Sequence, residues 1–472
     1  MLDFDYNDFE EEDSSDPQQL PDLIANFERL IQEDPDTYFD PDTLDEIATY
    51  YFEKENFPKA LEVINHLLNQ FPYTPEAWTK KGIILNYLQQ PEAAIEAFEH
   101  AESLTPYDSE ILVGKAIAYD QMGQKEEALQ LFEKVIQLDP HNDEVYFNWG
   151  ITLERMGHTE EAIEKFQQCA TLNPEHPDVW YELGFCYELL NQLDKSLTCY
   201  ERQLDRDPYS SHAWYNRGII LSRQNKLDEA IHSYELALAI DEEFASAHYN
   251  LANTLLQVGK VSEAIAHYQE VLRLEGDDAP TYHNLGLIYL EKGDYTQAHN
   301  YLIKAVRTDN EHADAWHDLG TCYEYMEKYE AAIRSYKRAI SLRPYIPAYW
   351  YALGDCYYEL DELDEAIDAY QRVVELAPNH IEGWIDLSEV FYEAELYDEA
   401  YYTLKRALQI SPSDGHLYFQ LARLQFKRGA IDDAIESIRT AFTIDPEQKA
   451  FFKRMFPDLY ADENVRALLG LD

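Results

Sequence analysis

Apolar and small residues recur along the chain with a helical spacing. In the stretch WYELGFCYELL they stand at Trp180, Leu183, Gly184 and Tyr187. Residues at i, i+3, i+4 and i+7 lie on one face of an α-helix, so this stretch predicts a helix with a buried stripe. Two closely similar stretches, WHDLGTCYEYM and WYALGDCYYEL, occur later in the chain. The pattern therefore belongs to a repeat rather than to a single site.

The spacing of the prolines shows that the pattern returns every 34 residues. Prolines stand at positions 72, 106, 140, 174 and 208, and the same step reaches Pro344, Pro378, Pro412 and Pro446. A fixed period of this length is the sequence signature of a solenoid built from small structural repeats. In this register twelve repeats begin at Pro41, Pro75, Ser109, Asp143, Pro177, Ser211, Ala245, Ala279, Ala313, Pro347, Ile381 and Gly415.

A second helix is predicted in the latter part of each repeat. Position 20 is alanine in eleven of the twelve copies, and Ser196 is the exception. A residue kept this small indicates two helices that cross too closely for a larger side chain. Turns such as MGQKEE, MGHTEE and KGDYTQ contain a glycine that can adopt the left-handed conformation at the end of the first helix. A proline at position 32 ends the second helix.

The repeat W-x-x-L-G-x-x-Y, followed by alanine, an aromatic residue, alanine and proline on a 34-residue period, resembles the tetratricopeptide repeat. The resemblance covers residues 41–448. It implies an all-α fold, a right-handed superhelical solenoid of antiparallel helix pairs. It also implies that the first helix of each pair lines a concave groove that holds an extended or helical peptide.

The segments outside the repeats are predicted to form the ends of the solenoid. Residues 1–20 are acidic and are expected to be a disordered tail, with a docking or autoinhibitory segment as the alternative. Residues 21–40 have the apolar pattern of an N-terminal capping helix, residues 41–448 are the twelve repeats, and residues 449–472 are expected to form C-terminal capping helices. A dimerisation surface is the alternative for the aromatic cluster near residue 452.

Composition and charge argue against several classes of partner. The chain has 91 acidic and 37 basic residues, which gives a formal net charge of −54. Such a charge repels phosphate backbones and anionic lipids, so we expect neither nucleic acid nor a membrane as partner. The sequence shows no membrane-spanning run and no secretory signal, and its five cysteines follow no CxxC spacing. A cytoplasmic, reducing location is expected.

Candidate chemistry is sparse. The motifs GxxxxGK[ST], HExxH and GxSxG are absent, and the repeats leave no segment for a catalytic domain, so we expect no enzyme activity and no cofactor. Cys186, Cys322 and Cys356 all stand at position 10, beside the buried stripe, and are interpreted as packing residues. His283 and His317 stand at position 5 of adjacent repeats, which we expect to be too far apart to share a metal ion.

Positions 5, 6 and 9 of the first helices are predicted to line the groove with an aromatic stripe beside a row of amides and carboxylates. Asparagine can hydrogen-bond a peptide backbone, and aromatic rings can receive lysine or arginine. Inherited repeat consensus is the alternative explanation of these residues. The candidate peptide-binding residues are Asn148, Tyr181, Tyr215, Asn216, Tyr249, Asn250, Asn253, His283, Asn284, His317, Asp318, Tyr351 and Asp355.

Charge favours one kind of partner for this groove. The exposed positions of the first helices carry mostly carboxylates, so a basic or Lys/Arg-bearing protein or peptide is expected. We therefore predict a scaffold or adaptor that binds through the groove. The alternative is a regulatory or assembly subunit that acts through its convex face or caps. The acidic positions are Asp120, Glu154, Glu188, Glu291, Glu324, Glu359 and Glu393, against the basic Arg155, Arg223, Arg423 and Lys427.

Overall fold

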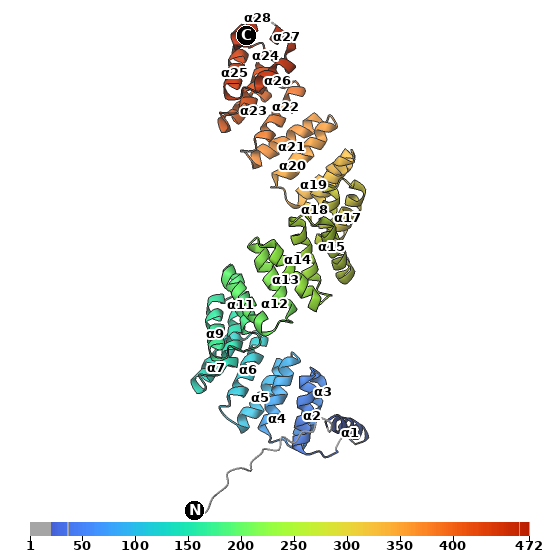
Figure 1. Ribbon diagram of the computed structural model, residues 1–472, viewed down its shortest axis with the longest axis vertical. Coiled ribbons are helices and arrows are strands. Elements are labelled where there is room, and N and C mark those ends of the chain that lie inside the picture. Colours follow the sequence, from blue (N-terminus) through green and yellow to red (C-terminus); the bar gives the residue numbers. More distant parts are fainter. Residues whose placement is uncertain (1–19, 35–36, 462, 472) are drawn as a thin grey trace, which may run out of the picture. The chain divides into compact units, whose positions relative to one another are not determined.

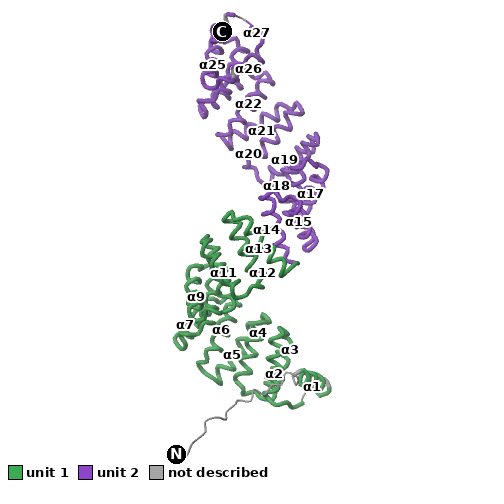
Figure 2. The backbone as a smooth tube through the Cα atoms, viewed as in Figure 1, with its two compact units in different colours: residues 1–242 green, residues 243–472 purple. Residues whose placement is uncertain are grey.

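The computed structural model describes residues 20–34, 37–461 and 463–471. Residues 1–19, on which the prediction of an acidic tail rests, lie outside the described residues. The chain divides into two compact units, residues 1–242 and residues 243–472 (Figure 2). We call them unit 1 and unit 2 and describe each by itself.

Unit 1 contains thirteen helices among its described residues (Figure 1). Helix α1 comes first, and the others follow as six pairs. The helices are α1 (Leu20–Glu33), α2 (Pro41–Glu53), α3 (Phe57–Gln70), α4 (Pro75–Tyr87), α5 (Pro91–Leu104), α6 (Ser109–Gln121), α7 (Lys125–Leu138), α8 (Asp143–Arg155), α9 (Thr159–Leu172), α10 (Val179–Leu189), α11 (Leu193–Arg206), α12 (Ser211–Arg223) and α13 (Leu227–Ile240).

Unit 2 contains six further pairs, followed by three short helices. These are α14 (Ala245–Gln257), α15 (Val261–Glu275), α16 (Ala279–Glu291), α17 (Tyr295–Thr308), α18 (Ala313–Tyr325), α19 (Tyr329–Leu342), α20 (Pro347–Glu359), α21 (Leu363–Leu376), α22 (Ile381–Glu393), α23 (Tyr397–Ile410), α24 (Gly415–Lys427), α25 (Ile431–Ile444), α26 (Gln448–Met455), α27 (Pro457–Ala461) and α28 (Glu463–Leu469). The predicted all-α solenoid of antiparallel helix pairs is confirmed. We call the first helix of each pair the A helix and the second the B helix.

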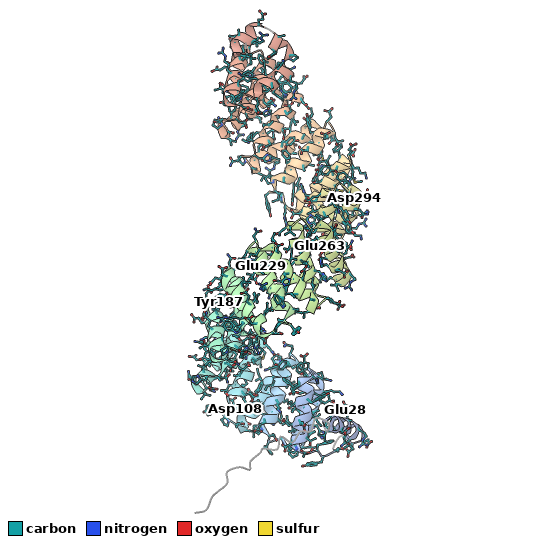
Figure 3. All side chains as sticks on the ribbon, viewed as in Figure 1. Glu28, Asp108, Tyr187, Glu229, Glu263 and Asp294 are labelled. Carbon is teal, nitrogen blue, oxygen red and sulfur yellow. The ribbon has the colours of Figure 1, made fainter. Side chains whose placement is uncertain are left out.

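Eleven of the twelve A helices start at the predicted first position of a repeat. Side-chain caps support these starts. In α6, for example, Asp108 Oδ1 accepts the N–H of Glu110 at 2.9 Å and so satisfies a donor of the first turn. Asp108 is labelled in Figure 3. The exception is α10, which starts at Val179 instead of Pro177. There the N–H of Asp178 donates to Nδ1 of His176 at 3.3 Å, and its φ of −120° and ψ of −5° are not helical.

Each helix pair packs around small residues. All eleven alanines at position 20 are fully buried. In α10, a Cβ added to Gly184 would lie 2.8 Å from Cε1 of Tyr200, so the ring of Tyr200 sits directly on the backbone of the A helix. Ser196, the exception to the alanine rule, donates its hydroxyl to the carbonyl of Gly184 at 2.7 Å. A hydroxyl is tolerated there because it has a partner.

The turn between the two helices of a pair is left-handed in every repeat, because position 15 has a positive φ in all twelve. Five repeats have glycine at this position, including those with MGQKEE, MGHTEE and KGDYTQ, and the predicted left-handed glycines are confirmed. A residue with a Cβ costs roughly 1–2 kcal/mol in this conformation. The other seven repeats nevertheless carry Glu55, Gln89, Asn191, Asn225, Glu327, Asp361 and Glu395.

The segments outside the pairs cover apolar side chains. Phe27 of α1 is 4% exposed, and the Tyr51 hydroxyl donates to Glu28 of α1 at 2.8 Å. At the other end, the ring of Phe452 in α26 is fully buried and packs on Phe442 of α25 with 5.9 Å between centroids. Phe452 is therefore not available to a second copy of the chain. The helices of the described chain are all too short or too polar to cross a lipid bilayer.

Candidate functional site

The A helices form one continuous side in each unit. Successive A helices contact one another, namely α4 with α6 and α6 with α8 in unit 1, and α16 with α18, α18 with α20, and α22 with α24 in unit 2. Successive B helices have no comparable contact among the described residues. The A helices therefore lie on the inside of the stack. We call the surface formed by positions 5, 6, 9, 12 and 13 of the A helices the inner face, and the surface of the B helices the outer face.

A regular set of side-chain contacts crosses the inner face. At five places position 5 of one repeat bonds to position 6 of the next, 35 residues further along the chain, and we call each such contact a rung. The rungs within unit 1 are Asp45–Lys80 (2.6 Å) and Tyr181–Asn216 (2.9 Å), and those within unit 2 are Tyr249–Asn284 (3.1 Å), His283–Asp318 (2.6 Å) and Tyr351–Asp386 (2.5 Å).

The rungs alter the role expected for the asparagines. The amide of Asn216 donates to the hydroxyl of Tyr181, and the amide of Asn284 donates to Tyr249 and approaches the hydroxyl of Tyr268 at 3.1 Å. These amides join neighbouring repeats, and only their remaining donors and lone pairs can serve a ligand. The other candidate amides and Tyr215 lie on inner-face positions of their helices, Asn148 in α8, Tyr215 in α12, and Asn250 and Asn253 in α14.

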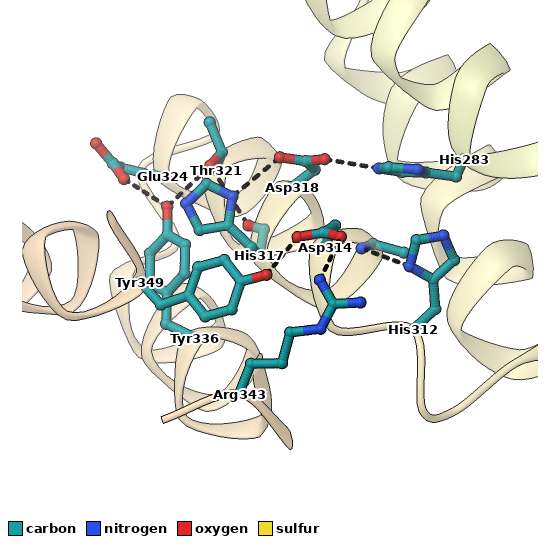
Figure 4. A network of polar contacts seen from close by, with 11 residues as sticks. His283, His312, Asp314, His317, Asp318, Thr321, Glu324, Tyr336, Arg343 and Tyr349 are labelled. Carbon is teal, nitrogen blue, oxygen red and sulfur yellow. Dashed lines mark hydrogen bonds and ion pairs between the residues drawn. The ribbon is translucent and has the colours of Figure 1, made fainter. Parts of the chain in front are cut away.

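Two histidines share one aspartate on the inner face of unit 2 (Figure 4). Asp318 of α18 bonds to Nε2 of His283 from α16 at 2.6 Å and to Nδ1 of His317 at 3.0 Å. Burial alone would raise the pKa of Asp318, but the hydrogen bonds from the two imidazoles outweigh it and lower the pKa to about 2. Asp318 is thus a buried carboxylate that links two A helices.

A second branch of the same network joins α18 to α20. The hydroxyl of Tyr349 donates to Asp314, and Arg343 pairs with the same carboxylate at 3.0 Å (Figure 4). The hydrogen bond from Tyr349, helped by the charge of Arg343, lowers the pKa of Asp314. The Tyr349 ring also stacks on His317 with 5.0 Å between centroids. These contacts hold the inner face of α16, α18 and α20 in one arrangement.

The described residues contain no group of three His, Cys, Asp or Glu side chains placed to hold a metal ion. The two histidines considered from the sequence, His283 and His317, are brought together by the structure, but both bond to Asp318. The cysteines at position 10 are fully buried, and burial raises the pKa of Cys186 to about 12. Their interpretation as packing residues is confirmed.

Carboxylates crowd the inner face of α18, α20 and α22. Burial raises the pKa of Asp355 to about 6, even though the hydroxyl of Tyr370 donates to it at 2.6 Å. The neighbouring carboxylates of Glu324 and Asp386 raise it further. Burial also raises the pKa of Asp386. The ionised forms of these groups repel one another, so a cation brought between them would be attracted.

Unit 1 shows the same effect on α10. Burial raises the pKa of Glu182 to about 7, and the carboxylates of Glu154 and Asp178 add to the shift. At this point of the inner face the preceding repeat has Phe147 at position 5, a side chain that cannot donate a hydrogen bond. Glu182 therefore has no rung to stabilise its ionised form.

The arginines of the inner face are engaged by carboxylates. Arg155 pairs with Asp120 at 2.6 Å, and Arg223 pairs with Glu188 at 3.1 Å. The sequence prediction that Asp120 is exposed is wrong. It is 8% exposed because the A helices approach closely and Arg155 of the next repeat bonds to its carboxylate. These pairs leave less positive charge to balance the remaining acids.

A hollow of about 670 Å³ on the inner face of unit 1 was not predicted. It is lined by α4, α6, α8 and the residues before α10, and it includes Asn86 and Gln121 at positions 12 and 13 of their repeats. Positions 12 and 13 entered the predicted charge of the groove through residues such as Asp120 and Arg155, but Asn86 and Gln121 were not among the candidates. The sequence signal was Gly114, the smallest residue at position 6 in the twelve repeats.

Comparison with protein families finds the same repeat along the chain. Models described as tetratricopeptide repeat match residues 153–216, 243–311, 318–381 and 391–453. A model described as TPR repeat matches residues 220–259, and one of the Psidin N-terminal TPR repeats region matches residues 50–151. No protein of curated function matches the sequence significantly.

Solved structures of other repeat proteins resemble parts of the chain. The Cut9-Hcn1 hetero-tetramer of the APC/C has 16% identity and a TM-score of 0.40 over 86% of this chain and 93% of that chain. The C-terminal part of a TPR protein from Cytophaga hutchinsonii has 19% identity and a TM-score of 0.45 over 50% and 98%. YrrB, a TPR protein described as having an unusual peptide-binding site, has 27% identity and a TM-score of 0.35 over 38% and 92%.

The helix pairs, the 34-residue register and the family matches agree with one another. The chain belongs to the tetratricopeptide repeat family, a family of protein-interaction scaffolds.

Proposed function

We propose that the chain is a scaffold or adaptor that binds a protein or peptide along the inner face, and that the bound segment carries lysine or arginine. Membership in the family supports binding of proteins in general. The choice of surface and the charge of the partner rest on the chemistry of the inner face.

The crowding of carboxylates on the inner face carries this proposal. Asp355 and Glu182 have pKa values of about 6 and about 7, because burial and neighbouring carboxylates disfavour their ionised forms. A lysine or arginine beside either group replaces repulsion by attraction. An acidic segment would add to the repulsion, so the inner face discriminates by charge.

The rungs prepare this surface for binding. The tyrosines of the rungs pack edge-on against aromatic residues of the B helices, as Tyr351 does against Tyr370 with 5.7 Å between ring centroids. Their hydroxyl groups are fixed by neighbours such as Asp386. Side chains that are already ordered lose little entropy when a partner binds, so more of the interaction energy contributes to affinity.

The alternative is a regulatory or assembly subunit that engages a larger complex through the outer face or the caps, with the acidic N-terminal tail as a docking or autoinhibitory segment. The outer face has many stacked cation–aromatic pairs, such as Arg202 on Trp180 at 4.4 Å. Those cations are already placed on rings. We favour the inner face because two of its acids, Glu182 and Asp355, form no ion pair among the described residues and are crowded by other carboxylates.

Matched sets of neutralising substitutions distinguish the two faces. The inner set is Glu154→Gln, Glu182→Gln, Glu324→Gln and Asp355→Asn, and the outer set is Glu133→Gln, Glu164→Gln, Glu235→Gln and Glu330→Gln, all four exposed on B helices. Both sets change the net charge equally. The affinity of the full chain for a short fluorescein-labelled peptide that alternates lysine and alanine is measured by fluorescence anisotropy.

We expect the inner set to lower the affinity about tenfold or more and the outer set to change it by less than about twofold. Loss of affinity in the outer set alone would support the alternative surface. Failure of the unsubstituted chain to bind the lysine peptide, or equal binding of a glutamate–alanine peptide, would overturn the proposal.

A further inference from the structure

The hollow of unit 1 lies between repeats that are not joined by rungs. Among the rung positions between α4 and α10, no pair can form a hydrogen bond between position 5 and position 6. The mismatched pairs are Thr79 with Gly114, Val113 with Asn148, and Phe147 with Glu182. Asn148 instead donates to a backbone carbonyl one turn earlier in its own helix, at 2.8 Å. Because no rung joins these A helices at positions 5 and 6, space remains between them there.

Gly114 cannot be replaced by a larger residue that would close this space. A Cβ on Gly114 would lie 2.2 Å from Cζ of Phe98, whose ring is fully buried between the second and third repeats. The core of the second repeat thus requires glycine at position 6 of the third. The packing of Phe98 against Gly114 therefore prevents a rung at this position.

Two residues that line the hollow, Asn86 and Gln121, each have a buried side-chain oxygen without a hydrogen-bond donor among the described residues. The Asn86 amide donates to the carbonyl of Gly114 at 2.9 Å, and the Gln121 amide donates to the backbone carbonyl of Asn86 at 3.2 Å. These bonds fix which end of each amide is the oxygen. Oδ1 of Asn86 and Oε1 of Gln121 are buried and unpaired among the described residues, and Asn86 is 6% exposed. An unpaired buried acceptor costs roughly 1–3 kcal/mol.

The other lining residues define the charge and shape of a ligand. Glu110, Glu144 and Asp178 are exposed carboxylates at the edge of the hollow, and no lysine or arginine is among its lining residues. Ile83 and Val113 supply apolar surface between them. A fitting group therefore combines an apolar stem with a positively charged head that donates several N–H bonds. Lysine and arginine side chains have this construction.

We propose that this hollow is the specificity pocket of unit 1 and that it receives a lysine or arginine side chain from a peptide bound along the inner face. The inference rests on the proposed function and adds to it a location and an anchor. Carboxylate ligands would meet the acids at the edge, and a purely apolar side chain would leave those acids without a counter-charge.

Introducing a rung at Val113 tests the pocket without removing an existing contact. Val113→Tyr puts an aromatic ring into the hollow and a hydroxyl opposite Asn148, as in the Tyr181–Asn216 rung. Ile431→Tyr makes a similar enlargement at a side chain that is 57% exposed on the outer helix α25, away from the inner face, and is the control. Affinity for the lysine–alanine peptide is measured by anisotropy on the full chain, and thermal unfolding checks that both variants fold.

A second pair of variants uses only exposed side chains. Glu110→Gln with Glu144→Gln and Asp178→Asn neutralises the edge of the hollow, and Glu126→Gln with Glu127→Gln and Glu133→Gln on α7 is the control of equal charge. We expect each hollow variant to weaken binding about tenfold and each control to change it by less than about twofold. Unchanged affinity in both hollow variants would overturn the pocket while leaving the proposed function in place. Absence of binding by the unsubstituted chain would overturn both.

Discussion

The hydroxyl of Tyr181 accepts a hydrogen bond of 2.9 Å from the amide of Asn216, which stands one repeat later on the neighbouring A helix. The same relationship between positions 5 and 6 recurs in both units with other donors and acceptors. It satisfies polar groups that are partly buried and sets the distance between A helices. The inner face is therefore an ordered surface, and the repeat pairs that lack a rung are as informative as those that have one.

A double-mutant cycle tests whether the rung stabilises the fold. We expect Tyr181→Phe and Asn216→Ala to be coupled by about 0.5–1.5 kcal/mol, because each change removes the same hydrogen bond. Chemical denaturation of the single and double variants measures the coupling. Additive effects would mean that the contact contributes nothing to stability.

The left-handed turns predict an unusual stabilising substitution. Glu327 has a φ of 57°, and Glu327→Gly should raise the stability of unit 2 by about 0.5–1 kcal/mol because glycine has no Cβ to strain, less the entropy that glycine loses on folding. The converse change, Gly293→Ala, should destabilise unit 2, because φ is 74° at this position. A Cβ there would meet no other atom within 4 Å, so the loss would come from backbone strain alone. Thermal unfolding of both variants checks the prediction, and a loss of stability in Glu327→Gly would contradict it.

Packing within a pair predicts different outcomes for two small residues that contact each other. Gly184→Ala should cost about 1–3 kcal/mol, because the added Cβ would lie 2.8 Å from the ring of Tyr200. Ser196→Ala should lower the free energy of unfolding by about 1 kcal/mol or less. Alanine is the usual residue at position 20, and the change removes only one hydrogen bond, from the Ser196 hydroxyl to the carbonyl of Gly184. Denaturant unfolding compares them. Similar losses would argue against close helix contact as the reason for small residues.

The raised pKa of Glu182 predicts how stability depends on pH. Its ordinary pKa is 4.5 and its pKa in the folded chain is about 7, so between these values the folded state binds more protons than the unfolded state. Stability from this group is therefore lost as pH rises from about 4.5 to about 7. Glu182→Gln should raise the unfolding midpoint at about pH 8, equivalent to about 1–2 kcal/mol after allowance for solvent screening, and should have little effect at about pH 4.

The control for this pH dependence is Glu229→Gln, an exposed glutamate on the outer helix α13 (Figure 3). We expect its unfolding midpoint to follow that of the unsubstituted chain at every pH. If Glu182→Gln also follows the unsubstituted chain at alkaline pH, the carboxylate of Glu182 is not under electrostatic strain in the folded chain.

Most of the helix pattern could be predicted because it depends on local periodicity. The spacing of Trp180, Leu183 and Gly184 predicts an A helix, and the alanines of position 20 predict close pairs. The start of α10 could not be predicted, since it depends on a hydrogen bond from Asp178 to the side chain of His176. Such a contact depends on a buried side-chain conformation and not on the repeat register.

The inner face could be predicted only in outline. Periodicity places Tyr181 and Asn216 on the same side, but a bond between them requires the offset between neighbouring A helices, which sequence spacing does not contain. The same offset brings Arg155 onto Asp120 and buries a carboxylate expected to be exposed. The unpaired oxygen of Asn86 likewise follows from packing around Gly114.

The partner's charge is the most direct test of the proposed function. It is measured by selecting peptides from a random displayed library with the full chain as bait and comparing the net charge of enriched and input sequences. We predict enrichment of peptides with a net positive charge and one or more lysine or arginine residues, weakened at high salt. Enrichment of acidic or uncharged peptides, or no enrichment, would contradict a Lys/Arg-binding inner face.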